Sequence, residues 1–385
     1  MKELKIFIIA GEASGDLYGA KLMNSLRDIY KGKINFYGIG GNRMNSEGLS
    51  SIFPMSEISI MGFLEIIPHI PNVLNRINQT VSEILKLRPD VVITIDSPGF
   101  NCRVVKKLQD SNIKLVHYVA PTVWAYKPKR AQKFAKLFDH LLLLLPFEPP
   151  YFDAVGLANT FVGHPIVETT IGNVNKAEFR KKHQIDNSDI LLCLMPGSRS
   201  TELTKLLNIF LETALILKAK HKNLKIIIPT LPPLAKQIKY AADYLDLDTI
   251  VVDNEDEKYA AYQASDIALV KSGTASLEVA LSGCPMIIAY KINHISYLIL
   301  KRMIKIKYAN LINLILDKEL IPELLQEKCF PKNLAESLEK LINSKDLRSK
   351  QIAESTAVFK QLGKDESSTP SEKASKKILK IICQA

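Results

Sequence analysis

The chain has 385 residues, of which 47% are apolar and 24% are charged, a composition typical of a globular protein with two domains of ordinary size. No apolar run is long enough to span a bilayer. The five scattered cysteines form no CxxC pair, which argues against zinc or a disulfide framework and favours a reducing cytoplasm. The formal net charge of +11 indicates a lysine-rich proteome or an anionic partner, and because RNA-binding and zinc-finger motifs are absent, we expect no nucleic-acid partner.

Short apolar segments typical of buried strands alternate with helical patterns along the whole chain. This alternation predicts an α/β fold with parallel sheets and helices on both faces. The pattern restarts near residue 190 after a passage rich in Gly, Pro and Asn, so we place a domain junction within 163–175. We expect two Rossmann-like, doubly wound domains facing across a cleft, with ligands at the carboxyl ends of the strands. The predicted strands are residues 5–10, 35–38, 91–95, 114–119, 140–145, 159–161, 190–195, 225–228, 249–252, 267–270 and 286–290.

Two glycine-containing turns follow the first strands of the amino-terminal half. The first strand, which we prefer to a signal peptide, leads into GEASGD at 11–16, and a glycine cluster begins at Gly38 after the next strand. Neither turn has the GxGxxG spacing of a dinucleotide fingerprint, which disfavours a dehydrogenase. Either the turns are tight turns with a structural role only, or they line the cleft and bind the molecule that reacts with a nucleotide-linked substrate.

Asp96 stands at the carboxyl end of the predicted strand 91–95, before a Pro-Gly turn. A partly desolvated carboxylate at this position of an open α/β sheet can remove a proton from a hydroxyl group. The alternative is that Asp96 caps a helix over 102–109. His117, inside an apolar strand, is expected to be a core histidine, and His164, near the domain junction, is either structural or in contact with ligand.

The carboxyl-terminal half contains two strand-to-helix turns suited to phosphate. Ser272-Gly273-Thr274 follows the strand 267–270, and a helix pattern then brings Glu278 about one turn further on. Unpaired backbone N–H groups at such a turn bind anions, and a carboxylate beside them can accept hydrogen bonds from sugar hydroxyls. Gly197-Ser198-Arg199 follows the strand 190–195, and its arginine supplies a planar fork for phosphate. Together the turns indicate a nucleotide site, although capped helices that bind nothing give the same local pattern.

Two segments, 58–77 and 295–315, carry much apolar surface, and the second also carries four basic residues. We expect them to lie on an anionic membrane surface, with core helices as the alternative. Asp246-Leu247-Asp248 has the DxD spacing of metal-dependent sugar transfer but falls in a predicted loop. No other cluster has metal-ligand spacing, so we expect no metal and no cofactor.

The assembled motifs resemble the lipid-A-disaccharide synthases, bacterial glycosyltransferases of the two-domain GT-B type. The similarity covers nearly the whole chain and departs from the family where an acidic residue is frequent at the position of Gly99, which weakens any role for a second carboxylate beside Asp96. The motifs are AGEASGD from Ala10, GIGGNRM from Gly38, MGFLEIIPHI from Met61, IDSPGFN from Ile95, APTVWAYKPKR from Ala120, LLPFEP from Leu144, FVGHP from Phe161, MPGSRSTEL from Met195, KSGTASLE from Lys271 and NLILDKELIPELLQ from Asn313.

The resemblance implies a glycosyl transfer with inversion at the anomeric carbon. The donor is UDP-2,3-diacylglucosamine, the acceptor is 2,3-diacylglucosamine 1-phosphate, and the products are a β-1,6-linked disaccharide 1-phosphate and UDP. The enzyme is expected in the cytoplasm, bound peripherally to the inner face of the cytoplasmic membrane, and a homodimer is left open. Rival hypotheses are a UDP-sugar epimerase of the same fold and a non-catalytic lipid-binding protein at the membrane surface.

The resemblance also assigns roles to domains and residues. Residues 1–168 form the acceptor and lipid domain, completed by a helix within 350–385, and residues 169–349 bind the UDP-sugar. Asp96 is the first candidate for the base, with Glu12 and Asp16 as further catalytic candidates. UDP is held by Gly197, Ser198, Arg199, Ser272, Gly273, Thr274, Glu278 and Asn313, and the acceptor or its lipid chains by Ser14, Gly15, Met61, Phe63 and Leu64.

Overall fold

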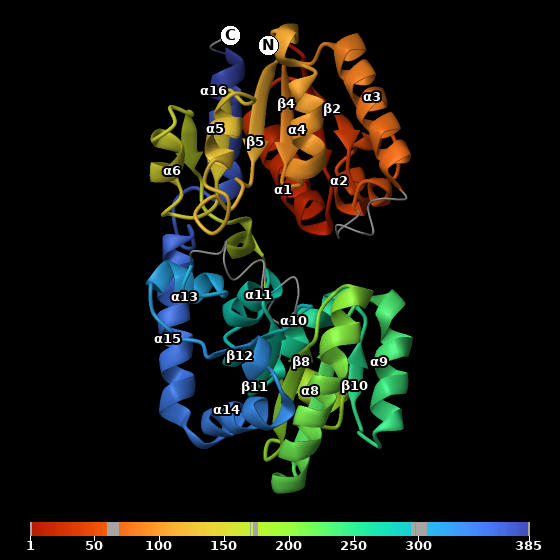
Figure 1. The fold of residues 1–385 in the computed structure, drawn as a ribbon, viewed down its shortest axis with the longest axis vertical. Helices are drawn as coiled ribbons and strands as arrows, with labels where there is room; N and C mark the ends of the chain where they lie inside the picture. Colours follow the sequence, from red (N-terminus) through yellow and green to blue (C-terminus); the bar gives the residue numbers. More distant parts are fainter. Residues whose placement is uncertain are drawn as a thin grey trace. The chain divides into compact units, whose positions relative to one another are not determined.

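The computed structural model describes residues 2–59, 69–169, 171, 176–293, 297 and 306–383, with the side chains of 255 and 256 left out. The chain divides into two compact units (Figure 1). The first comprises Met1–Glu168 and Gln361–Ala385, and the second comprises Thr169–Lys360. Each unit is an α/β layer structure around its own parallel sheet.

The first unit contains a seven-stranded parallel sheet in the order β3-β2-β1-β4-β5-β6-β7. Its central strands are apolar because both faces are covered by helices, as expected for parallel sheets. The phenylalanine and isoleucine side chains of β1 alternate between the two faces, and Phe7 and Ile9 pack with α3 and α4. The strands are β1 (Leu4–Ala10), β2 (Ile34–Ile39), β3 (Ser50–Ser51), β4 (Val91–Ile95), β5 (Lys114–Tyr118), β6 (His140–Leu143) and β7 (Asn159–Phe161).

Helices of the first unit come from both ends of the chain. The carboxyl-terminal helix α16 (Pro370–Cys383) packs against α1 (Ala13–Ile29). Backbone N and Oγ of Ser371 donate to the carboxylate of Glu168, at 2.6 and 2.8 Å, and fix the start of α16. The other helices are α2 (Asn42–Ser46), α3 (Ile70–Leu87), α4 (Pro98–Lys106), α5 (Arg130–Ala135) and α6 (Pro149–Asp153), with 3₁₀ turns η1 (Met55–Glu57), η3 (Gln109–Ser111) and η4 (Pro165–Glu168).

The second unit repeats this plan with a six-stranded parallel sheet in the order β10-β9-β8-β11-β12-β13. Leucines of α8, α9 and α14 pack with the sheet in one apolar core. The strands are β8 (Ile190–Met195), β9 (Leu224–Pro229), β10 (Ile250–Val252), β11 (Ile267–Lys271), β12 (Met286–Tyr290) and β13 (Glu323–Leu325). The helices are α7 (Lys176–Lys182), α8 (Ser200–Lys220), α9 (Pro232–Tyr244), α10 (Glu255–Ala264), α11 (Ala275–Leu281), α13 (Leu311–Leu316), α14 (Pro331–Asn343) and α15 (Lys345–Gln361), with the turn η5 (Gln326–Lys328).

The predicted fold class is confirmed, because both sheets are parallel and doubly wound and every strand expected from the apolar runs forms. Only β3 and β13 were not expected among the described strands, and both are short strands at sheet edges. In each sheet the strand order reverses beside the first strand, where Ala10 pairs with Ile95 and Met195 pairs with Val270. Ligands of doubly wound sheets bind at this switch point, beyond the carboxyl ends of the strands.

Candidate functional site

The switch point of the second sheet brings the two predicted phosphate turns together. The turn at Gly197 and Arg199 follows β8, and the turn that begins at Ser272 follows β11, its hydrogen-bonded neighbour. Lys271, the last residue of β11, places its Nζ 2.9 Å from Oε1 of Glu202 in the first turn of α8. The turns are therefore connected through an ion pair that the sequence analysis missed.

The Glu202 carboxylate is the centre of this arrangement. Its Oε2 accepts a hydrogen bond from the backbone N–H of Ser198 at 3.0 Å, and its Oε1 lies 3.3 Å from Nη1 of Arg199. A Cβ on Gly197, whose φ is +134°, would lie 2.5 Å from the same carboxylate, so glycine is required there. Burial raises the pKa of Glu202, but the hydrogen bond and charge of Lys271, the backbone N–H of Ser198 and the charge of Arg199 together outweigh it and leave that pKa below its usual value.

An anionic oxygen is thus already stabilised at the amino-terminal end of α8, by a backbone N–H and two cationic side chains. These are the donor types that bind the oxygens of a diphosphate. Glutamate at the third helical position is a common capping residue, and this spacing was the available sequence signal for Glu202. Its pairing with Lys271 had no local signal, because 69 positions separate the residues.

The second turn has an exposed tip and a fixed base. Gly273 and Thr274 are exposed, whereas the Ser272 hydroxyl donates to the carbonyl of Ala309 at 3.0 Å. Further along α11, the Glu278 carboxylate accepts hydrogen bonds from Lys258 Nζ, at 3.1 Å, and from the Tyr259 hydroxyl, at 3.0 Å. Both partners belong to α10, so Glu278 is held half-buried beside the turn.

Asn313 has a structural role in the second unit. Its side chain is fully buried, and its Oδ1 accepts hydrogen bonds from the backbone N–H groups of Leu320 and Ile321, both at 2.9 Å. Its Nδ2 donates to the carbonyl of Ile321 and to Glu323. All four hydrogen-bonding positions of the amide are therefore used within the chain. Asn313 therefore fixes the segment between α13 and β13, and its contact with UDP stays a prediction.

In the first unit, Asp96 directly follows β4 and is half-buried. Asp96 and Ser97 both adopt left-handed backbone conformations, with φ of 48° and 43°. Such consecutive non-glycine residues are strained and are common at functional sites. Asn101 Nδ2 donates to the Asp96 carbonyl at 2.7 Å and stabilises this turn. Helix α4 begins at Pro98 with Ser97 as its N-cap residue, so the helix-capping alternative for Asp96 is wrong.

The GEASGD turn lies against the Asp96 turn. A Cβ on Gly11 would clash with the side chain of Ser97, and one on Gly15 would lie 3.6 Å from Ile95. Glu12 is the N-cap residue of α1 and, like Ser14, is half-buried. The structure therefore brings these predicted residues to the same sheet edge as Asp96.

Asp16 differs from the other candidates of this turn because its carboxylate is used internally. It is 5% exposed and accepts hydrogen bonds from the backbone N–H groups of Gly41, Arg43 and Met44, at 2.7, 3.0 and 3.1 Å. These bonds satisfy the first donors of α2. Asp16 thus holds the Gly41 turn in place, and a catalytic role for its carboxylate stays a prediction.

Glu148, which the sequence analysis did not single out, connects two of the family-like motifs. Its carboxylate accepts hydrogen bonds from Trp124 Nε1 at 3.2 Å and from the backbone N–H groups of Leu144 and Leu145, at 3.1 and 3.0 Å. Burial raises the pKa of Glu148 to about 7, although these three donors oppose the rise. The residue therefore holds the segment that leads to α5 against the end of β6.

Both candidate histidines are structural. His117 is fully buried, its Nδ1 lies 2.7 Å from Thr94 Oγ1, and burial lowers its pKa to about 3. His164 is also buried, accepts a hydrogen bond from the backbone N–H of Ile166 at 3.1 Å, and has a pKa lowered by burial to about 3.

The remaining predictions concern metals and lipids. Asp246 and Asp248 are exposed between α9 and β10, at the edge of the sheet opposite the two turns. Among the described residues, no group of three or more His, Cys, Asp or Glu could hold a metal ion, and the metal-free reaction stays a prediction. Met61, Phe63 and Leu64 lie outside the described residues.

Comparison with known proteins decides the family. Residues 6–378 match the family model described as lipid-A-disaccharide synthetase. The chain belongs to the lipid-A-disaccharide synthase family. It is 44% identical over 384 residues to the lipid-A-disaccharide synthase of Rhodospirillum centenum, covering 99% of this chain and 96% of that protein.

This member of the lipid-A-disaccharide synthase family has the GT-B glycosyltransferase fold. It is similar to the glycotransferase of kitacinnamycin, with a TM-score of 0.66, 13% identity, and coverage of 99% of this chain and 100% of that chain. It is also similar to a UDP-GlcNAc 2-epimerase from Neisseria meningitidis bound to UDP-GlcNAc, with a TM-score of 0.65, 12% identity, and the same coverage. At these identities the likeness concerns the fold alone, so it does not favour an epimerase. The family makes the chain a glycosyltransferase of lipid A disaccharide synthesis.

Proposed function

We propose that the chain transfers the sugar of UDP-2,3-diacylglucosamine to the 6-hydroxyl of 2,3-diacylglucosamine 1-phosphate. The C1–O bond to the diphosphate breaks and a C1–O6 bond forms on the opposite face. The products are a β-1,6-linked disaccharide 1-phosphate and UDP. The observation that supports this proposal best is the clustering of Lys271, Arg199 and the backbone N–H of Ser198 around one carboxylate at the second switch point.

The second unit binds the UDP part of the donor in this proposal. The diphosphate takes over from Glu202 as the acceptor of hydrogen bonds at the amino-terminal end of α8. Negative charge develops on the diphosphate as the C1–O bond breaks, so Lys271 and Arg199 stabilise the transition state more than the bound donor. Glu278, held by Lys258 and Tyr259, is placed one turn into α11 to accept hydrogen bonds from the ribose hydroxyls.

The first unit holds the acceptor, and Asp96 is the base that takes the proton of its 6-hydroxyl. The strained turn after β4 fixes the position of the carboxylate, and its half-burial reduces its hydration. A general base of this kind contributes roughly 10²–10⁴-fold to a rate. Glu12 and Ser14 lie at the same sheet edge, where they are available to hydroxyl groups of the acceptor sugar.

The lipid chains of both substrates require access to a membrane surface. Ile70 and Leu74, in the first turns of α3, are 44% and 51% exposed. Apolar side chains exposed on an amphipathic helix are typical of peripheral membrane binding. In the described part of the chain, no helix is both long and apolar enough to cross a membrane. We therefore propose peripheral binding at the inner face of the cytoplasmic membrane.

The test is UDP release from UDP-2,3-diacylglucosamine in detergent micelles, with and without 2,3-diacylglucosamine 1-phosphate. Release that depends on the acceptor, with a disaccharide product, is the expected result. Release without acceptor, or conversion of UDP-N-acetylglucosamine to its epimer, would contradict the proposal. If the donor binds but neither UDP release nor sugar transfer occurs, the proposed nucleotide site would stand and the proposed transfer reaction would not.

A further inference from the structure

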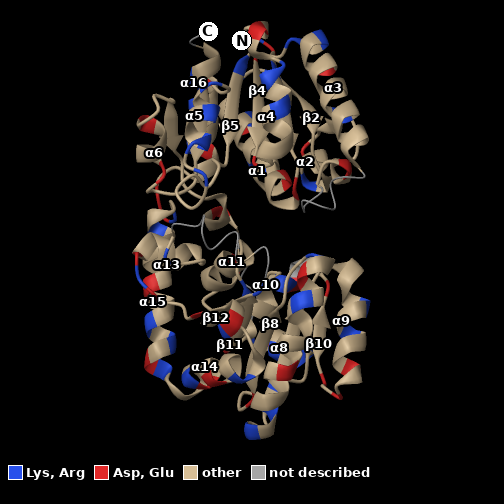
Figure 2. Ribbon diagram, in the orientation of Figure 1, with Lys and Arg blue, Asp and Glu red and all other residues tan. Residues whose placement is uncertain are grey.

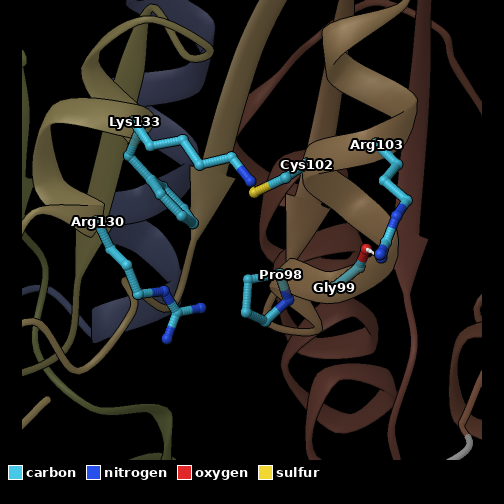
Figure 3. A pocket seen from close by; sticks show the side chains of 7 residues that line it. Pro98, Gly99, Cys102, Arg103, Arg130 and Lys133 are labelled. Carbon is cyan, nitrogen blue, oxygen red and sulfur yellow. Dashed lines mark hydrogen bonds between the residues drawn. The ribbon is translucent and has the colours of Figure 1, made fainter. Parts of the chain in front are cut away.

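A pocket of about 270 Å³ lies in the first unit, between the start of α4 and helix α5 (Figure 3). Pro98 and Cys102 of α4 line one side, and Arg130 and Lys133 of α5 line the other. The lining begins two residues after Asp96, the proposed base, so the pocket adjoins the proposed acceptor site. Complete small-molecule sites usually have about 300–1,000 Å³, so this space suits one compact group of a larger ligand.

The lining of this pocket is cationic. Three of its residues, Arg103, Arg130 and Lys133, carry positive charge, and none carries negative charge. Figure 2 shows Lys and Arg on both flanking helices. Within the described part of the chain, none of the three forms an ion pair, although the Arg103 guanidinium donates to the carbonyl of Gly99. Cations gathered without a counter-charge repel one another, and a bound anion reverses that repulsion.

The positions of the side chains bring the charges to one space. Figure 3 shows Lys133 extending from α5 toward Cys102, and Arg130 directed toward Pro98. Burial raises the pKa of the Cys102 thiol, and the charges of Lys133, Arg130 and Arg103 all oppose that rise. The Cys102 thiol at the edge of the pocket therefore experiences the field of all three cations.

We propose that this pocket binds the phosphate monoester of the acceptor glycolipid. The assignment rests on the proposed function and adds to it the group that positions the acceptor. The planar guanidinium of Arg130 pairs with two phosphate oxygens, and the ammonium of Lys133 supplies a point charge on the third. A phosphate held here orients the sugar so that its hydroxyl reaches the turn at Asp96.

The experiment compares two double variants of the same loop and helix. Arg130→Gln with Lys133→Gln removes two charges that line the pocket, and Lys129→Gln with Lys136→Gln removes two exposed charges that do not. Binding of 2,3-diacylglucosamine 1-phosphate and of unphosphorylated 2,3-diacylglucosamine is measured in neutral detergent micelles. We expect the pocket variant to bind the phosphorylated lipid at least about tenfold more weakly and the other lipid unchanged. Equal losses for both lipids, or no loss, would overturn the proposal.

A second arm separates the acceptor from the membrane as the source of the phosphate. Flotation with phosphatidylglycerol vesicles should be equal for the two double variants. A pocket variant that loses vesicle binding but keeps micellar acceptor binding would assign the pocket to a phospholipid and overturn the proposal. Thermal unfolding of each variant checks that it folds. These binding measurements use neither the UDP donor nor turnover. A failure of the phosphate proposal is therefore distinguished from a failure of the proposed transfer reaction, which is tested by UDP release from the unmodified protein.

Discussion

The Nζ of Lys271 lies 2.9 Å from Oε1 of Glu202, although 69 positions separate the two residues. The contact joins the end of β11 to the first turn of α8, the helix that follows the neighbouring strand β8 at the switch point of the second sheet. The ion pair therefore holds a cation where a diphosphate is expected, and the diphosphate has to exchange partners with Glu202.

Lys271→Met should raise KM for the UDP donor about tenfold and leave KM for the acceptor unchanged. A charge-assisted hydrogen bond to an anion is worth about 1.5–3 kcal/mol, which corresponds to about tenfold or more in affinity. Steady-state kinetics with each substrate varied in turn gives the answer. Lys205→Met removes an exposed charge from α8 and serves as the control. An unchanged donor KM in Lys271→Met would remove the lysine from the UDP site.

Arg199→Ala should weaken donor binding and also lower kcat. The positive charge of Arg199 stabilises the negative charge that develops on the leaving diphosphate, and the variant lacks it. Arg199→Lys keeps the charge but loses the planar fork, so its activity should lie between those of Arg199→Ala and the unmodified enzyme. Donor kinetics at a series of concentrations separate the two effects. Donor kinetics identical to those of the unmodified enzyme would exclude the role.

Asp96→Asn should lower kcat by about 10²–10⁴-fold with little change in UDP affinity, because it removes the proposed base and keeps the shape of the side chain. UDP affinity is measured by calorimetry and turnover by UDP release. Asp110→Asn, at an exposed 3₁₀ turn, is the matched control. Near-normal turnover of Asp96→Asn would direct attention to Glu12, which lies at the same sheet edge.

Much of the fold was predictable, because parallel strands buried on both faces are almost entirely apolar. The sites at the strand ends were predictable for the same reason: Asp96 directly follows a recognisable strand, and Arg199 lies in the short turn after another. The roles of Asp16 and Asn313 were not predictable, because sequence does not reveal which distant backbone groups lack partners. The Asp16 carboxylate accepts a hydrogen bond from the backbone N–H of Gly41, and the Asn313 amide accepts hydrogen bonds from those of Leu320 and Ile321. In a sequence, a buried structural polar residue resembles a ligand-binding one.

Leu74→Ser should weaken binding to vesicles of anionic phospholipid by about tenfold, since burying a leucine contributes about 1.5–3 kcal/mol. High salt should release the unmodified protein further, because screening weakens the attraction of its basic residues to the surface. Co-sedimentation over a range of lipid and salt concentrations measures both effects. Tyr240→Ser is the control, because Tyr240 is 76% exposed on α9 in the other unit. Equal binding of the Leu74 variant and the unmodified protein would place the membrane surface elsewhere.

Glu148 should make the stability of the folded chain depend on pH near neutrality. Burial raises its pKa to about 7, whereas its ordinary value is 4.5. Between these values the folded state retains a proton that the unfolded state has released, so the free energy of unfolding falls as pH rises through this window. Glu148→Gln has no such group. The stability of the unmodified protein relative to this variant should therefore fall by about 3 kcal/mol between pH 4.5 and 7.5.

Urea unfolding of both proteins across this range measures the difference directly. The buried histidines His117 and His164 also titrate, but they are present in both proteins and their contribution cancels. Glu57→Gln is the matched control: the Arg76 hydrogen bond holds the pKa of Glu57 below its usual value, so this pair should show no change above pH 4.5. If the difference in the free energy of unfolding between the unmodified protein and Glu148→Gln does not change with pH, the hydrogen bonds from Trp124 and from the end of β6 keep Glu148 ionised despite its burial.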